Sequence, residues 1–168
     1  MMLFANRKGI LSFDGGEEPL PLEIPIIPFS VQLNPYDHRV YIGGENDYGY
    51  IEKNKMGSYR YESMSGDSVE LGLVTKIIFN DSLVWFYSER TLSCQNIKTN
   101  KLRLRLYAGS GNPFTGIFIT PKNTYINVSN KGLYRLESDT LCPVPNGYLT
   151  QKTDILFSLP YDHSCHPP

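Results

Sequence analysis

Ser129–Asp139 has the sequence SNKGLYRLESD, and a similar stretch, NRKGILSFDG, occupies Asn6–Gly15. Both place a Lys-Gly pair before two apolar or aromatic residues, a polar residue, an apolar residue and an acid-rich turn. This order is typical of a turn that leads into a short β-strand. Two such stretches so far apart in one chain indicate an internal repeat.

Two weaker copies lie between these stretches. They are YGYIEKNKMG at Tyr48–Gly57 and ERTLSCQNIKTN at Glu89–Asn100. The four copies align on Gly9, Gly49, Arg90 and Gly132. The steps between these positions are 40, 41 and 42 residues. A step this regular predicts one structural unit of about 40 residues that recurs along the chain.

Each repeat contains four short apolar or alternating segments separated by turn residues. Strands directly before the copies are expected at residues 38–44, 82–88 and 123–129. Strands one place further upstream are expected at 29–37, 75–81, 115–123 and 153–162. A fourth strand is expected at 58–64, 101–108 and 140–145. Four short strands per repeat of about 40 residues predict β-propeller blades. A β-sandwich also has short strands and regular turns, and it is the alternative.

The predicted fold is therefore all-β, a partial β-propeller over residues 1–162. Three complete four-stranded blades are expected at about 29–65, 66–108 and 109–147, with an outer half-blade at 6–28. An inner strand is expected at 153–160, and residues 163–168 form a tail. Because most propellers have more blades, we expect a fragment of a larger ring.

Net charge, the length of the apolar runs and the cysteines exclude several kinds of binding partner and site. The formal net charge is −1 and the basic residues are scattered, which argues against a nucleic-acid partner. The longest apolar runs are far shorter than a membrane span, so no membrane insertion by this chain is expected. The cysteines are Cys94, Cys142 and Cys165. Their odd number and wide spacing predict neither a disulfide framework nor a C-x-x-C metal site.

The repeats resemble the two-component regulator propeller family, the sensor propellers of bacterial hybrid histidine kinases and of helix-turn-helix regulators with a triple-tyrosine domain. The motifs that carry the resemblance are VYIGGENDYGYIE (Val40–Glu52), LVWFYSERTL (Leu83–Leu92) and KGLYRLESDTLCPVPNG (Lys131–Gly147). INVSNKGLYRL, at Ile126–Leu136, fits the blade pattern best. The resemblance implies a ligand sensor, often for carbohydrate, in a periplasmic or other extracytoplasmic location.

The loop GENDYGYIEKN, Gly44–Asn54, has more acids and glycines than the other junctions. It lacks the Lys-Ser/Thr of a phosphate-binding loop. Glu45 and Asp47 could be paired carboxylates, but no opposing acid is recognisable. A plain hairpin turn explains the residues, and ligand contact is the functional alternative. The candidate ligand-binding residues at the blade junctions are Glu45, Asp47, Tyr48, Arg90 and Asn130.

No other motif predicts catalysis, a cofactor or a metal. His38 lies in a turn and is expected to be solvated, and no serine-triad pattern is present. His163, Cys165 and His166 offer metal ligands only superficially, in a Pro-ended tail. Trp85, in the middle of a strand, is expected in the core. We therefore expect no catalytic residues and no enzyme.

Two functions from different classes remain. The first is a binding module that takes a small molecule or a glycan. The second is an assembly module, because open blades leave unpaired strand edges. In that case we expect self-association or closure, with residues 153–159 completing the N-terminal half-blade. Closure within one chain would give about four blades, and exchange between two chains about eight.

Overall fold

The structure is a computed structural model and describes residues 2–6, 8–13, 15–16, 20–22, 24–53, 55, 59–66, 70–153 and 155. The chain divides into two compact units, residues 1–107 and 108–168. Apart from one short 3-10 helix, η1 (Gly147–Thr150), every regular element in the described part is a β-strand. The all-β prediction is confirmed.

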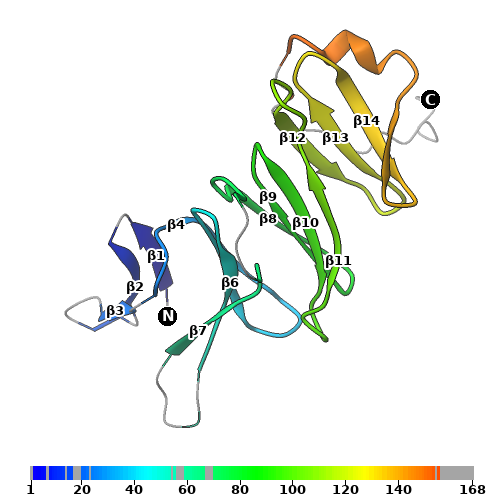
Figure 1. Cartoon of the computed structure of the whole chain (residues 1–168). Helices are drawn as coiled ribbons and strands as arrows, with labels where there is room; N and C mark the ends of the chain where they lie inside the picture. The colour runs from blue at the N-terminus through cyan, green and yellow to red at the C-terminus, as the bar shows by residue number, and fades with distance from the viewer. Residues whose placement is uncertain are drawn as a thin grey trace, which may run out of the picture. The chain divides into compact units, whose positions relative to one another are not determined.

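The first unit contains two four-stranded antiparallel sheets, and each is a simple meander in chain order (Figure 1). The first blade consists of β4 (Pro28–Leu33), β5 (Val40–Gly44), β6 (Tyr48–Lys53) and β7 (Tyr59–Ser63). The second consists of β8 (Lys76–Asn80), β9 (Leu83–Tyr87), β10 (Thr91–Asn96) and β11 (Leu102–Tyr107). Consecutive pairing is the topology expected of propeller blades, because each strand is joined to its neighbour by a short turn.

The N-terminal sheet also belongs to the first unit and differs from the expected half-blade. It has three strands, β1 (Met2–Asn6), β2 (Gly9–Phe13) and β3 (Leu20–Leu22). The prediction began this region at residue 6 and overlooked β1. The segment Met2–Asn6 shows no alternation of apolar and polar residues, so only its pairing with β2 reveals it as a strand.

The second unit contains the third blade. Its strands are β12 (Phe114–Ile119), β13 (Thr124–Val128), β14 (Gly132–Glu137) and β15 (Thr140–Pro143), paired in that order. Helix η1 follows and lies against β14, where Gly132 and Gly147 meet. A Cβ atom on Gly132 would lie 2.1 Å from the carbonyl oxygen of Gly147, so this contact requires glycine. The inner strand expected at 153–160 lies outside the described residues, except for Thr153 and Ile155.

The repeat positions found in the sequence mark the start of the third strand in each of the three four-stranded blades, and the start of the second strand, β2, in the three-stranded N-terminal sheet. Gly9 begins β2 and Gly132 begins β14, while Gly49 is the second residue of β6. Arg90 directly precedes β10. The recurring pattern therefore marks one kind of structural event, a hairpin turn that leads into the next strand of the sheet.

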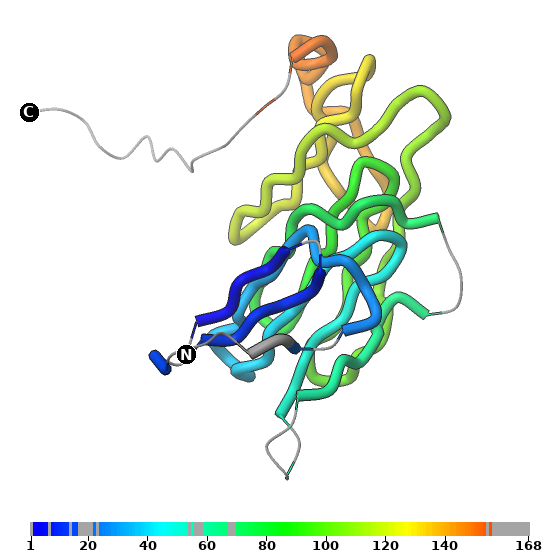
Figure 2. Tube along the Cα trace, turned by 90° about the vertical axis from the view of Figure 1, so that its left-hand side faces the viewer, coloured from blue at the N-terminus to red at the C-terminus, as the bar shows by residue number. Residues whose placement is uncertain are grey.

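The core of the first unit lies between its sheets. Aromatic side chains fill the space between the first and second blades, where Tyr41 packs edge-on against Phe79 with ring centroids 5.1 Å apart. A second, aliphatic cluster joins the N-terminal sheet to the first blade, and it includes Ile10, Ile42 and Ile51. Figure 2 shows the blue N-terminal strands beside the first blade. Trp85 is buried, as expected.

The meander fixes which connections share an end of the blade. Neighbouring strands run in opposite directions, so the turn between the second and third strands lies at the same end as the link to the next blade. In the first unit these connections are residues 45–47, 64–75 and 88–90. The turns after the first and third strands lie at the opposite end. Among the described residues, no helix has the length and hydrophobicity needed to cross a membrane.

Candidate functional site

In the loop Gly44–Asn54, residues 45–47 form a tight hairpin turn between β5 and β6. The amide of Gly44 donates to the carbonyl of Asp47 over 2.9 Å, and Asn46 takes a left-handed conformation with φ 57°. Asparagine tolerates this conformation better than most residues. The hairpin interpretation is confirmed. Any role of this loop beyond the turn must therefore come from its side chains.

The side chain of Asp47 holds this end of the first blade together through hydrogen bonds. Its carboxylate accepts four hydrogen bonds, from the Tyr48 amide at 2.8 Å, Ser63 at 2.7 Å, Ser65 at 2.5 Å and the Tyr61 hydroxyl at 3.0 Å. Burial, and then the negative charge of Asp47, raises the pKa of Tyr61 above its usual value. The tyrosine therefore remains a donor at neutral pH. These contacts assign Asp47 a structural role in the turn.

Tyr48 lies in the core between the two blades of the first unit, with only 1% of its surface exposed. Its ring stacks on Phe86 with centroids 3.9 Å apart. Its hydroxyl accepts hydrogen bonds from Arg105 at 2.7 Å and Gln95 at 3.2 Å. The ligand contact predicted for Tyr48 therefore finds no support in its position, because a ligand at the surface would reach it only through its neighbours.

The connection between the two blades lies directly against this turn. Its Gly72 amide donates to the side-chain oxygen of Asn46 over 2.9 Å, and the Asn46 amide donates to the Gly72 carbonyl over 3.0 Å. The Val74 amide donates to Gly44 over 3.0 Å. These bonds give residues 72–74 the position of a short additional strand beside the hairpin.

On its other side, the connection is held by the turn between β9 and β10. The hydroxyls of Ser88 and Thr91 both donate to the Leu71 carbonyl. The side chain of Arg90 lies along Gly72 and forms an ion pair of 2.9 Å with Glu70. Gly72 has φ 76°, and a Cβ there would meet the Arg90 stem at 3.3 Å. The three segments form one hydrogen-bonded surface.

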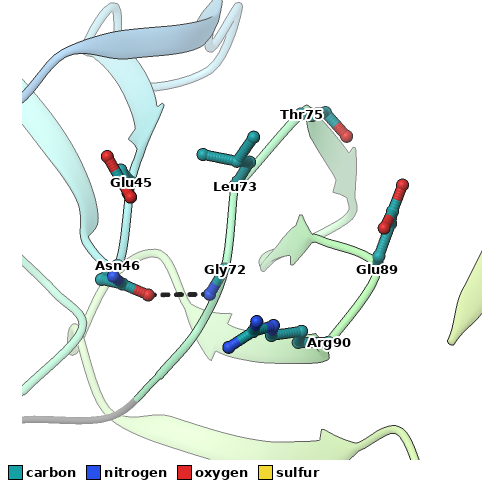
Figure 3. A pocket seen from close by; sticks show the side chains of 7 residues that line it. All are labelled: Glu45, Asn46, Gly72, Leu73, Thr75, Glu89 and Arg90. Carbon is teal, nitrogen blue, oxygen red and sulfur yellow. Dashed lines mark hydrogen bonds between the residues drawn. The ribbon is translucent and has the colours of Figure 1, made fainter. Parts of the chain in front are cut away.

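A pocket of about 360 Å³ opens on this surface (Figure 3). The lining residues come from the hairpin, the connection and the β9–β10 turn, and they are Glu45, Asn46, Gly72, Leu73, Thr75, Glu89 and Arg90. In Figure 3, Asn46 reaches toward Gly72, while Glu45 and Glu89 come from the two different blades. The structure thus brings together Glu45 and Arg90, two of the candidate ligand-binding residues.

The pocket carries more negative than positive charge. Glu45 and Glu89 are exposed, and neither has an ion pair or side-chain hydrogen bond within the described part of the chain. The positive charge of Arg90 is shared with Glu70, which lies just outside. Thr75 adds an exposed hydroxyl, and Leu73 adds an apolar surface that is 44% exposed. The pocket can therefore offer two free carboxylates and a small apolar surface to a ligand.

Asn130, the remaining candidate, belongs to the second unit. It occupies the turn between β13 and β14 with φ 62°. Its side-chain amide donates to the Gly111 carbonyl over 3.2 Å, and its backbone amide donates to Gln151 over 2.9 Å. These contacts are those of a turn residue, and they do not join Asn130 to the pocket of the first unit.

Sequence reasoning missed Leu73, Thr75 and Glu89 as pocket residues. Leu73 and Thr75 lie in the connection between repeats, which has no motif of its own. The only available signal was topological, since that connection shares an end of the blade with the turn before the third strand. No group of His, Cys, Asp or Glu in the described residues could hold a metal ion. His163, Cys165 and His166 lie outside them.

These sheets define the class of the protein as an all-β fold of β-propeller blades. The C-terminal WD40 domain of Sif2 is similar in structure, with a TM-score of 0.55 and 13% sequence identity. The similarity covers 80% of this chain and 40% of the Sif2 domain chain, so this chain spans less than half the length of that chain. No protein-family model and no curated protein matches the sequence.

Proposed function

We propose that this protein is a non-catalytic binding module that takes a small polar ligand in the pocket between Glu45 and Arg90. The observation that carries the proposal is the contrast between the pocket's frame and its side chains. The frame is fixed by hydrogen bonds among residues 44–47, 71–74 and 88–91. The charged groups of Glu45 and Glu89 are left exposed above it. A rigid frame with a few free polar groups is typical of ligand sites.

The charge of the pocket selects the class of ligand. Two free carboxylates favour a ligand with positive charge, and they also accept hydrogen bonds from hydroxyl groups. Leu73 can cover an apolar part of the ligand. An amino sugar satisfies all three conditions and is the carbohydrate version of the proposal.

The test compares glucosamine oligomers with N-acetylglucosamine oligomers by calorimetry on the full chain. The two ligands differ in charge at the amino group. We expect the charged oligomer to bind, and its affinity to fall as the salt concentration rises, because exposed charge pairs are screened. In Glu45→Gln and Glu89→Gln proteins we expect binding to weaken about three- to tenfold each.

Asp139→Asn is the matched control, because it removes an exposed carboxylate from a turn of the second unit. Asp139 has φ 66°, which asparagine accepts. This variant should bind as the wild type does. Equal binding of both oligomers would contradict the charge argument, and no binding of either would contradict the site.

The biological setting that we propose is signal sensing outside the cytoplasm, in a protein of the two-component regulator propeller type. The support is the resemblance of the repeats, above all Ile126–Leu136, to that family. A fusion of the native gene product to alkaline phosphatase tests the location, since this enzyme folds to its active form in an oxidising compartment. An inactive fusion would contradict the location but would leave the binding site open to test.

A second candidate function, assembly through a strand edge, is favoured by β1. Within the described residues, β1 pairs only with β2, so its other edge is open. Met2 and Phe4 on this strand are 59% and 45% exposed. An open edge with apolar side chains favours pairing with a further strand. Light scattering should then show a dimer that Phe4→Lys dissociates, and a wild-type monomer at all concentrations would exclude the dimer.

A further inference from the structure

A second pocket, of about 440 Å³, lies at the opposite end of the blades of the first unit. It is formed by the β4–β5 turn, the β8–β9 turn and the β10–β11 turn. By the direction of the strands, these turns are at the other end from Glu45 and Arg90. The lining residues are Tyr36, Asp37, Asp81, Ser82, Ile97 and Lys98.

The β4–β5 turn holds one carboxylate of the pocket in a fixed position. The fully buried Asn34 accepts the Tyr36 amide at 3.0 Å through its side-chain oxygen. The carboxylate of Asp37 accepts the Tyr41 hydroxyl and the Arg39 amide, both at 3.0 Å. Each carboxylate oxygen can accept more than one hydrogen bond, so Asp37 is fixed and still able to accept from a ligand.

The other two turns are joined to each other, which places a second carboxylate and an ammonium group on neighbouring turns. The Ile97 amide donates to the Ser82 carbonyl over 2.9 Å. The side chain of Asn96 accepts the Lys98 amide at 3.0 Å. Asp81 directly precedes Ser82, and Lys98 directly follows Ile97. The backbone bond between the turns therefore brings these two charged residues to the same pocket.

Three side chains of the pocket have no evident structural duty. Asp81 and Lys98 are exposed, and among the described residues neither the carboxylate nor the ammonium group has a hydrogen bond or ion pair. They do not pair with each other either. The ring of Tyr36 is 74% exposed, so it buries little apolar area on folding. All three groups are available to a ligand.

We propose that this pocket binds a free α-amino acid with an apolar side chain, in its zwitterionic form. The α-ammonium group donates to the carboxylates of Asp81 and Asp37, and the α-carboxylate accepts from the ammonium group of Lys98. The apolar side chain packs on the ring of Tyr36. The two carboxylates repel an anion and Lys98 repels a cation, so a ligand that carries both charges is favoured.

The Glu45 pocket differs from this one in its positive group. Its Arg90 is already paired with Glu70 over 2.9 Å, whereas Lys98 is unpaired in the described part of the chain. Of the two pockets, the second therefore offers a free cation to an α-carboxylate. This site is additional to the proposed function and does not depend on it.

Calorimetry on the full chain tests the proposal with leucine, methionine and phenylalanine, each beside its amide and its N-acetyl derivative. The amide lacks the carboxylate charge, and the N-acetyl derivative lacks the ammonium charge. Slightly acidic pH keeps the free amine of the amides charged. We expect at least one of the amino acids to bind saturably, and each of its derivatives to bind about three- to tenfold more weakly. Added salt should reduce the difference.

Variants assign each charge of the ligand to one residue. Asp81→Asn should weaken the amino acid and its amide about three- to tenfold and leave the N-acetyl derivative unchanged. Because Asp81 has φ 53°, asparagine fits the same turn. Lys98→Gln should weaken the amino acid and the N-acetyl derivative and leave the amide unchanged. Tyr36→Ala should weaken all three ligands, because they share the side chain. Partial unfolding would not produce this crossed pattern.

Matched controls come from the second unit. Asp139→Asn removes an exposed carboxylate from a turn residue with φ 66°, and Lys131→Gln removes an exposed ammonium group. Neither should alter binding. Glu45→Gln should also have no effect, so this site can fail or succeed independently of the first. The proposal is overturned if no amino acid binds at millimolar concentration, if the derivatives bind as well as the amino acid, or if Asp139→Asn weakens binding as much as Asp81→Asn does.

Discussion

At the scale of single residues, Glu45 and Asp47 have different roles although they lie in one turn. Asp47 accepts three hydrogen bonds from Tyr61, Ser63 and Ser65 that tie the turn to the end of β7, whereas Glu45 is exposed at the pocket. The sequence showed two acids two positions apart and could not separate them. The difference arises from Tyr61, Ser63 and Ser65, which reach Asp47 only after β6 and β7 pair.

Removal of the Asp47 carboxylate should destabilise the protein. Asp47→Ala leaves the Tyr61 and Ser65 hydroxyls without their acceptor, and we expect a loss of about 2–4 kcal/mol in the free energy of unfolding. Urea denaturation measures it. Glu45→Ala, in the same turn, should change stability by less than about 0.5 kcal/mol. Equal effects of the two substitutions would contradict the assigned roles.

Tyr61 should make the protein less stable at high pH. Its pKa is raised in the folded state, first by burial and then by Asp47, while an unfolded tyrosine ionises near pH 10. Stability from this residue is thus fully present below about pH 10 and is lost as the pH rises further, by less than about 1.4 kcal/mol per pH unit. In Tyr61→Phe, urea denaturation between pH 8 and pH 11 should show a flatter decline. Tyr148→Phe controls for loss of a phenol, and an unchanged slope in Tyr61→Phe would refute the argument.

At the scale of the elements, the repeat in the sequence located one hairpin turn in each sheet, because these turns impose similar local demands on the chain. Gly9 begins the second strand of the N-terminal sheet and Gly132 begins the third strand of the third blade. Their φ values are 130° and 97°, which favour glycine. The connection at residues 70–75 was not predictable in this way. Its order comes from bonds to Asn46, Ser88 and Thr91, which lie in other elements.

Gly49 should be the most sensitive position of the first blade. A Cβ atom there would lie 2.0 Å from the Glu62 carbonyl oxygen, so alanine would push β7 away from β6. We expect Gly49→Ala to cost about 3 kcal/mol or more of unfolding free energy, measured by urea denaturation. Gly109→Ala is the control, because its Cβ would meet nothing closer than 3.9 Å. A loss below about 1 kcal/mol in Gly49→Ala would contradict the close pairing.

At the scale of the whole molecule, the sequence predicted the class of fold and three blades, but neither the extra strand nor the pockets. The blades repeat in sequence because each meets the same packing demands. The second strand of each blade is mostly buried, and Tyr41, Val84 and Ile126 in these strands are fully buried. β1 has no such pattern. The pockets combine residues from two blades of the first unit, so they depend on how sheets pack, which a single sequence pattern does not encode.

The central claim is that the frame around Gly72 presents Glu45, Glu89 and Arg90 to a ligand. Amide chemical-shift mapping of the isotope-labelled full chain, titrated with glucosamine oligomers, tests it most directly. The account predicts saturable shifts at the amides of Asn46, Gly72, Glu89 and Arg90. Absence of shifts there at millimolar oligomer, or shifts confined to residues outside this pocket, would contradict it.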